Sequence, residues 1–253
     1  FLCKLMGIKI IVRSNSAPDG WSQNIIKFFC FKIIFSLADK IIVNSYEFKK
    51  RFKNKFNLKT ICIYNPLDKN DIIKKSRIKN KIGFKKKVLK IINVGRFTDQ
   101  KDQITLLKAI NLIKKKIDLN LLIVGRGKEK ANLLNFIKDN NLSKIVKLVN
   151  FQKNPFHLIG SSNLFVLTSI YEGLPNVILE AMTLKKFVIS SNCPTGPQEI
   201  LLNGKCGFLF KPGDYKKLSD LIIFYSRNKK KLKPKISLAY KDLIRFDYQK
   251  NLE

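Results

Sequence analysis

Two glutamates, Glu172 and Glu180, stand eight positions apart in the stretch SIYEGLPNVILEAM, residues 169 to 182. On one unbroken helix they would lie about 80° apart around the axis, at about 100° per residue. Their side chains would then neither line up along the helix nor lie on opposite faces of it. Gly173 and Pro175 instead predict a tight turn, because glycine suits the turn and proline suits the first helical position. We therefore expect Glu172 in a loop and Glu180 about one turn into a helix that begins near Pro175.

The start of this predicted helix has the chemistry of an anion site. Its free backbone N–H groups and the positive end of its dipole suit a diphosphate, although an ordinary helix start without a ligand is the alternative. Two glycine-arginine pairs, Gly95-Arg96 and Gly125-Arg126, each follow an apolar run. Glycine allows a ligand to approach the backbone closely, and arginine binds phosphate. They predict a phosphate site, and for the glycines at 125 and 127 a plain strand-to-helix turn is the alternative.

Repeated apolar runs predict the elements that position these residues. Five runs, separated by helix-like segments, occupy residues 89 to 97, 119 to 127, 145 to 152, 162 to 169 and 186 to 192. This alternation predicts a parallel sheet with helices on both faces. Ligands of such sheets bind beyond the carboxyl ends of the strands. The candidates are the residues just after each run: Gly95, Arg96, Gly125, Arg126, Gly127, Phe151, Gln152, Tyr171, Glu172 and Gly173.

The first part of the chain predicts a smaller unit of the same kind. Apolar runs at residues 8 to 13 and 39 to 45 resemble buried strands, and residues 21 to 37 between them have apolar side chains at helical spacing. Asn, Pro and Asp then concentrate at residues 63 to 71, and a lysine-rich stretch without strong periodicity continues to about residue 87. We expect one βαβ unit, followed by a domain boundary in this polar stretch.

Composition limits the classes of partner. The chain has 253 residues, of which 45% are apolar, so it is long enough for one large domain or two ordinary ones. Its 50 basic and 18 acidic side chains give a net charge of +32, which is typical of proteins that meet nucleic acid or an anionic membrane. Most of the basic residues are lysines, whereas arginine is better suited to base edges. We therefore expect a solvated lysine surface and no nucleic acid partner.

Cysteine and histidine usage favours a reduced, metal-free protein. The five cysteines form no C-x-x-C pair, and His157 is the single histidine. The most apolar long stretch, residues 21 to 37, is interrupted by Lys27 and Lys32 and is too short to span a membrane. We expect a cytoplasmic protein whose basic surface and 21-to-37 segment contact the inner face of the cytoplasmic membrane. Packing of that segment on the sheet is the alternative.

Five stretches together resemble a known family. They are VGRFTDQKD, LLIVGRG, NLFVLTSIYEGLPNVILEAM, FVISSNCPTGPQEIL and NGKCGFLFKPGD. In order and spacing they resemble the C-terminal domain of family 4 (group 1) glycosyltransferases over residues 89 to 214, and the pair Glu172 and Glu180 is the most specific part. The earlier stretches ADKIIVNSYEFKKRF and IYNPLD resemble the end of that family's N-terminal domain and its interdomain linker.

The resemblance implies an α/β fold of the GT-B type, in which two Rossmann-like domains face a cleft. It implies that residues 1 to 68 are the C-terminal part of the acceptor-side domain and that residues 69 to 88 are the linker and the entry to the second domain. Residues 89 to 240 are then the donor-binding domain, and residues 241 to 253 begin the helix that returns to the first. The family's N-terminal glycine-rich loop has no counterpart here, so we expect an N-terminally truncated fragment with an incomplete first domain.

The family transfers a sugar from a nucleotide diphosphate with retention at the anomeric carbon. The resemblance implies that Arg96 and Lys101 neutralise the donor diphosphate and that Glu180 accepts hydrogen bonds from the ribose. Glu172 would contact the donor sugar near its reacting carbon, so Glu172, Arg96 and Lys101 are the expected catalytic residues. The remaining donor-binding residues implied are those of the diphosphate cap, the base pocket and two glycines: Gly173, Leu174, Pro175, Asn176, Val177, Phe151, Gln152, Gly95 and Gly127.

No D-x-D pair that would hold a divalent metal occurs in the sequence. We therefore expect metal-independent transfer without a cofactor, with Arg96 and Lys101 acting where a metal would. Arg13 and Asn15 occupy the place of a histidine in many relatives and are acceptor-side candidates, with structural strand-end residues as the alternative. The implied activity is transfer from a UDP-sugar to a glycan or lipid-linked acceptor in cell-surface polysaccharide or lipopolysaccharide assembly. A non-catalytic nucleotide-sugar-binding fragment and a basic nucleic-acid-binding protein are the other hypotheses.

Overall fold

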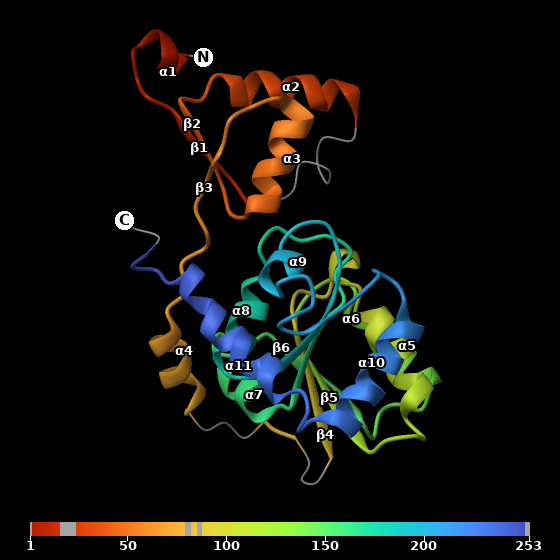
Figure 1. Ribbon diagram of the computed structural model, residues 1–253. Helices are drawn as coiled ribbons and strands as arrows, with labels where there is room; N and C mark the ends of the chain where they lie inside the picture. Colours follow the sequence, from red (N-terminus) through yellow and green to blue (C-terminus); the bar gives the residue numbers. More distant parts are fainter. Residues whose placement is uncertain (1, 16–23, 79–81, 85–87, 251–253) are drawn as a thin grey trace.

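The computed structural model describes residues 2–15, 24–78, 82–84 and 88–250, which form two parallel sheets flanked by helices (Figure 1). A three-stranded sheet with its helices lies at the top of the view, and a six-stranded sheet lies below it. Both predicted sheets are therefore confirmed. Residues 16–23, which include part of the apolar segment at 21 to 37, lie outside the described residues.

The smaller sheet contains the predicted βαβ unit. Its strands are β1 (Ile11–Ser14), β2 (Lys40–Val43) and β3 (Ile61–Cys62), which pair in that order and run parallel. Helix α2 (Ile25–Ser36) connects β1 to β2, α3 (Tyr46–Phe56) connects β2 to β3, and a short helix α1 (Leu2–Leu5) precedes β1. The sequence pattern did not predict β3, because two residues are too few to show an alternation.

Helix α3 packs on this sheet through three phenylalanines spaced four residues apart. Phe48, Phe52 and Phe56 are each at most 1% exposed, and Phe35 of α2 packs against Phe52 with ring centroids 5.0 Å apart. The hydroxyl of Ser45 accepts a hydrogen bond from the backbone N–H of Phe48, and this bond caps the helix start. The i, i+4 spacing places the three rings on one face, so a row of aromatic rings forms the core of the smaller unit.

A short helix that the sequence pattern did not predict lies between the two sheets in the chain. Helix α4 (Lys69–Ser76) begins after Asp68, whose carboxylate accepts from the N–H of Asp71. It packs against α7 (Phe156–Ser161) and α8 (Asn176–Thr183) of the larger unit. Further along the chain, a 3-10 turn (Leu243–Phe246) leads to Asp247, which forms a parallel bridge with Leu67. The end of the described chain thus returns beside the segment that leaves β3.

The larger sheet contains the five predicted strands and one more. These are β4 (Leu89–Val94), β5 (Leu119–Gly125), β6 (Val146–Asn150), β7 (Leu164–Leu167), β8 (Phe187–Ser191) and β9 (Phe208–Phe210). Their order is β6-β5-β4-β7-β8-β9, and every neighbouring pair is parallel. The strand order reverses between β4 and β7, and the crevice at such a switch point is the expected ligand site of a doubly wound fold.

Alternating side chains of these strands supply two separate cores. Ile91 packs with α5 (Gln103–Ile113), α6 (Lys130–Asp139) and α10 (Tyr215–Asn228) on one face. Ile92 packs with α7, α8 and α11 (Lys233–Asp242) on the other face. Because both faces are covered, the central strands carry apolar side chains on both faces rather than on one. A rigid two-faced layer therefore carries the loops at the carboxyl ends of β4, β5 and β7.

Candidate active site

Two adjoining cavities lie at the carboxyl ends of the central strands. The larger, about 800 Å³, lies between the two units and is lined by Arg13 and Asn15 from one side and by Lys101 and Glu172 from the other. The smaller, about 410 Å³, is lined by side chains that include Phe151, Gln152 and Glu180. Four residues line both cavities: Val94, Gly95, Arg96 and Val177. An elongated ligand can therefore extend from one cavity to the other past Gly95 and Arg96.

The Gly-Leu-Pro turn forms as predicted. Helix α8 begins at Asn176 after Pro175, whose φ of −73° is the value at which its ring fixes the backbone. Glu172 lies in the loop before this helix, and Glu180 lies inside it. Gly173 comes so close to the other unit that an added Cβ would lie 2.2 Å from the backbone oxygen of Asn15. Any side chain at position 173 would therefore push the two walls of the larger cavity apart.

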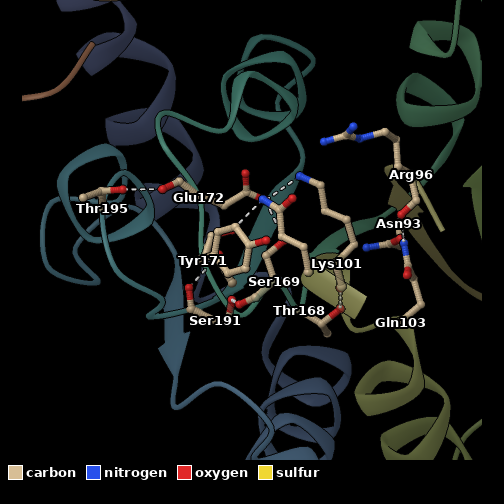
Figure 2. Close-up of polar contacts among 12 residues, drawn as sticks. Asn93, Arg96, Lys101, Gln103, Thr168, Ser169, Tyr171, Glu172, Ser191 and Thr195 are labelled. Carbon is tan, nitrogen blue, oxygen red and sulfur yellow. Dashed lines mark hydrogen bonds and ion pairs between the residues drawn. The ribbon is translucent and has the colours of Figure 1, made fainter. Parts of the chain in front are cut away.

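The carboxylate of Glu172 is held by two donors. Only 7% of Glu172 is exposed, and its Oε1 accepts hydrogen bonds from Lys101 Nζ at 2.5 Å and from Ser169 Oγ at 2.6 Å (Figure 2). A buried charge is stable only when it is paired, and Lys101 supplies the opposite charge. No donor from the described residues reaches Oε2, so this oxygen can accept a hydrogen bond from a ligand in the cavity.

Hydroxyl groups on neighbouring strand ends fix the loop that carries Glu172. Thr195 Oγ1 donates to the backbone oxygen of Glu172, and Ser191 Oγ donates to the backbone oxygen of Ser169 at 2.6 Å (Figure 2). Thr168 Oγ1 donates to the backbone oxygen of Lys101 at 2.8 Å. Thr168, Ser191 and Thr195 were not predicted from the sequence as part of the site. The only available signal was the cluster of serine and threonine just after two apolar runs.

Glu180 has a different environment from Glu172. Burial raises the pKa of its carboxyl to about 7, and no hydrogen bond or ion pair of that carboxyl exists among the described residues. The side chain lines the smaller cavity. A carboxylate without a partner at the edge of a cavity can accept two hydrogen bonds from vicinal hydroxyl groups of a ligand.

Part of the lining of the smaller cavity is a stacked cation and aromatic ring. The guanidinium of Arg126 lies over the ring of Phe151, 4.8 Å from its centroid, and Phe151 is 56% exposed. Gln152 donates from Nε2 to the backbone oxygen of Asn150 at 3.1 Å. An aromatic or planar ring of a ligand can stack on such a surface. Phe151, Gln152, Arg126 and Glu180 thus all line the smaller cavity.

The glycines of the site have different neighbours. A Cβ at Gly125 would lie 1.9 Å from the backbone oxygen of Gly95, so the ends of β4 and β5 can approach only because residue 125 is glycine. Gly127 has a φ of +153°, and its Cβ would lie 2.2 Å from the backbone oxygen of Phe97. Gly127 is not among the residues lining either cavity, so packing against Phe97 accounts for it and a donor contact stays a prediction.

Arg96 is exposed where the cavities join, and its side chain extends toward the region of Lys101 Nζ (Figure 2). Its backbone oxygen accepts from Gln103 Nε2 at 2.9 Å, which anchors the residue while leaving the guanidinium in the cavity. The two cations that the sequence analysis placed on a diphosphate therefore line the same cavity. Lys101 pairs with Glu172 there, whereas Arg96 faces the shared region.

The described residues contain no group of three or more histidine, cysteine, aspartate or glutamate side chains arranged to hold a metal ion. In the same part of the chain, no helix combines the length and the apolar character needed to cross a bilayer.

Comparison with known proteins assigns the family. The family model described as glycosyl transferases group 1 matches residues 74–242, more than half of the chain. The chain is therefore a member of the group 1 glycosyltransferases. It is 36% identical over 224 residues to an uncharacterised glycosyltransferase of Methanocaldococcus jannaschii, a match that covers 79% of this chain and 55% of that protein. It is also 32% identical over 185 residues to the amylovoran biosynthesis glycosyltransferase AmsD of Erwinia amylovora, covering 70% of this chain and 48% of AmsD.

Solved structures agree on the fold. The chain superposes on Anabaena HepE in complex with UDP with a TM-score of 0.83 at 21% identity, covering 98% of this chain and 71% of HepE. Staphylococcus aureus TarM gives a TM-score of 0.81 at 19% identity, covering 97% of this chain and 49% of TarM. These neighbours have the GT-B architecture, which is therefore the fold class of this chain. The chain spans about half the length of the curated relatives it matches.

Proposed function

We propose that this chain binds a nucleoside diphosphate sugar across the two cavities and that the protein transfers the sugar to a hydroxyl acceptor. The observation that carries the proposal is the junction of the cavities at Gly95 and Arg96, with Glu180 on one side and the Lys101–Glu172 pair on the other. We propose that the parts of the donor lie along this path in their covalent order. Phe151 and Arg126 receive the base, Glu180 the ribose, the cations the diphosphate, and Glu172 the sugar.

Catalysis of the transfer step depends on stabilising the leaving group. Negative charge develops on the diphosphate as the bond to the sugar breaks, and fixed donors aimed at that charge stabilise the transition state. Arg96, Lys101 and the free N–H groups at the start of α8 supply these donors. Loss of one such donor typically costs about 3 kcal/mol in related oxyanion sites. Because three kinds of donor are available, we propose that transfer proceeds without a divalent metal.

The donor nucleotide that we propose is UDP. HepE was solved with UDP and also with UDP-glucose, and TarM was solved with UDP. We further propose transfer with retention at the anomeric carbon, as the family resemblance implies. The configuration of the product, measured by the anomeric coupling constant in NMR spectra, tests this part separately. A product of inverted configuration would contradict it.

The acceptor that we propose is a glycan or a lipid-linked glycan of a cell-surface polysaccharide. AmsD is named for amylovoran biosynthesis, and a Campylobacter jejuni relative with 29% identity is named for transfer to a diphospho-undecaprenol acceptor. Helix α2 exposes Ile26, Phe29 and Ile33 beside lysines, which supports contact with an anionic membrane. Flotation with anionic liposomes tests this contact, and an absence of binding even at low salt would remove it.

Thermal unfolding in the presence of nucleotides tests the proposal as a whole. A ligand present at about 100 times its dissociation constant should raise the free energy of unfolding by about 2.7 kcal/mol. We expect UDP and one or more UDP-sugars to stabilise the chain and uridine to do so far less. If no nucleoside diphosphate stabilises it, the proposed function is wrong. If a donor binds but no sugar is transferred to any hydroxyl acceptor, the non-catalytic binding alternative is favoured.

A further inference from the structure

A chain of three polar side chains crosses the larger cavity from one unit to the other. Arg13 on β1 donates from a guanidinium nitrogen to Asn65 Oδ1 at 2.8 Å, and Asn65 donates from Nδ2 to Asn176 Oδ1 at 2.8 Å. Asn65 lies between β3 and α4, and Asn176 is the first residue of α8. All three line the cavity that holds Lys101 and Glu172. Asn65 was not among the site residues predicted from the sequence.

The donors and acceptors of Arg13, Asn65 and Asn176 fix the direction of the hydrogen bonds between them. An amide oxygen and an amide nitrogen are nearly alike in shape, so only the hydrogen-bond partners decide which way an asparagine is turned. Arginine has donors and no acceptor, so Asn65 must present its oxygen to Arg13 and its NH₂ group to Asn176. Asn176 must then present its oxygen to Asn65. Its own NH₂ group has no partner among the described residues and is left for the cavity.

We propose that Asn65 is a positioning residue that holds Asn176 with its NH₂ group toward the donor diphosphate. Phosphate oxygens accept hydrogen bonds and do not donate them, so they match the NH₂ group and not the amide oxygen. The backbone N–H groups at the start of α8 face the same region, and Asn176 extends that set of donors by one. This inference rests on the proposed function, because it assumes a nucleoside diphosphate in the cavity.

The substitution Asn65→Asp keeps the hydrogen bond from Arg13 but reverses the direction of the hydrogen bond between residues 65 and 176. A carboxylate still accepts from Arg13, but it has no hydrogen to donate to Asn176. Asn176 then turns its NH₂ group to residue 65 and presents its oxygen to the phosphates. We expect the affinity for UDP to fall about tenfold, the usual effect of replacing one favourable hydrogen bond to a charged group by an unfavourable contact. Asn54→Asp adds the same charge at an exposed position that does not line this cavity and is the matched control.

A double-mutant cycle separates the effect of the Asn176 orientation from the effect of the charge added at residue 65. Calorimetric titration of UDP is carried out with Asn65→Asp, with Asn176→Ala and with the double variant, and thermal unfolding checks that each folds. If Asn65 acts through Asn176, Asn65→Asp causes little further loss once residue 176 is alanine. An equal tenfold loss in both backgrounds would mean that charge alone acts, and it would overturn the inference.

The outcomes distinguish this inference from the proposed function. If the wild-type chain binds neither UDP nor another nucleoside diphosphate, the proposed function and this inference both fail. If the wild type binds and Asn65→Asp binds as well as Asn54→Asp, the proposed function stands and the inference alone is wrong.

Discussion

Glu172 and Glu180 illustrate how two identical side chains acquire different properties from their surroundings. Lys101 and Ser169 hold one oxygen of Glu172, whereas Glu180 is partly buried, has no partner among the described residues, and has its pKa raised to about 7 by burial. Their spacing in the sequence was enough to predict a loop position for one and a helix position for the other. The pairing of Glu172 with Lys101 could not be predicted, because the two residues are 71 positions apart and only the fold brings them together.

At this scale we predict that Glu180 makes the protein less stable as the pH rises. Its folded-state pKa of about 7 lies above the ordinary value of 4.5, so the folded chain keeps a proton that the unfolded chain releases. The free energy of unfolding therefore falls as pH rises through this window. Glutamine at position 180 does not titrate. The free energy of unfolding of Glu180→Gln, relative to that of the wild type, should therefore increase by about 2 to 3 kcal/mol between pH 4 and pH 8. Urea unfolding at both pH values measures this, and a constant difference would contradict it.

Asn65 and Thr195 show which site residues remain hidden in a single sequence. Asn65 stands in a polar stretch that predicts only a linker, and its role depends on partners at positions 13 and 176. Thr195 has a φ of +62° and is fully buried, an arrangement that the pattern of apolar residues does not indicate. Short-range patterns predicted the residues after each strand, whereas the contacts that hold them in place join distant segments.

The elements follow the sequence closely where strands are long and buried. The five apolar runs became β4 to β8, but β9 was not predicted because three residues beside glycine give no clear pattern. Helix α4 was also not predicted. Lys69 and the pair Lys74-Lys75 obscure the apolar spacing, and Ile72 is its one buried residue.

The ends of β4 and β5 provide a prediction about the elements. Gly125→Ala should lower the free energy of unfolding by about 3 kcal/mol, because its Cβ would lie 1.9 Å from the fixed backbone oxygen of Gly95. Gly95→Ala is the matched control, since the nearest atoms to its Cβ would be those of the Lys101 side chain, at an ordinary 3.5 Å. We expect a change within about 0.5 kcal/mol there. Urea unfolding compares the two, and equal losses would show that the close approach of the strands is unimportant.

For the whole molecule, the junction of the two units depends on Glu199. Its carboxylate accepts from the N–H groups of Tyr46 and Glu47 at 3.1 and 3.0 Å and from the hydroxyl of Tyr64 at 2.5 Å. Glu199 belongs to α9 (Pro197–Ile200) of the larger unit, whereas Tyr46 and Glu47 begin α3 of the smaller one. A carboxylate at a helix N-terminus also interacts favourably with the helix dipole.

We predict that Glu199→Ala loosens this junction. The loss of a helix cap typically costs about 1 to 2 kcal/mol, and the two units should move apart more easily. Small-angle scattering should show a larger radius of gyration for Glu199→Ala than for the wild type. Gln198→Ala is the control, because Gln198 bonds to Asn203 of its own unit. Identical scattering from both variants would mean that Glu199 does not hold the units together.

The sequence was sufficient to predict a two-unit α/β protein and the edge of the sheet at which the site lies. It could not predict how closely the two units approach. That depends on single contacts. One is the close approach of Gly173 to Asn15, where an added Cβ would lie 2.2 Å from the backbone oxygen. Another is the set of three hydrogen bonds that Glu199 accepts. The chain matches about half the length of its relatives, so the transfer activity of the whole protein is a proposal that builds on this arrangement.

We propose above all that Glu180 binds the ribose and that Glu172 binds the sugar of one donor that lies across both cavities. Calorimetric titration of UDP and of a UDP-sugar into Glu180→Ala and Glu172→Gln tests it directly. Glu180→Ala should weaken both ligands by about tenfold or more, because both contain the ribose, whereas Glu172→Gln should weaken only the UDP-sugar. If both variants lose the same affinity for UDP, the assignment of the two carboxylates to opposite ends of the donor is wrong.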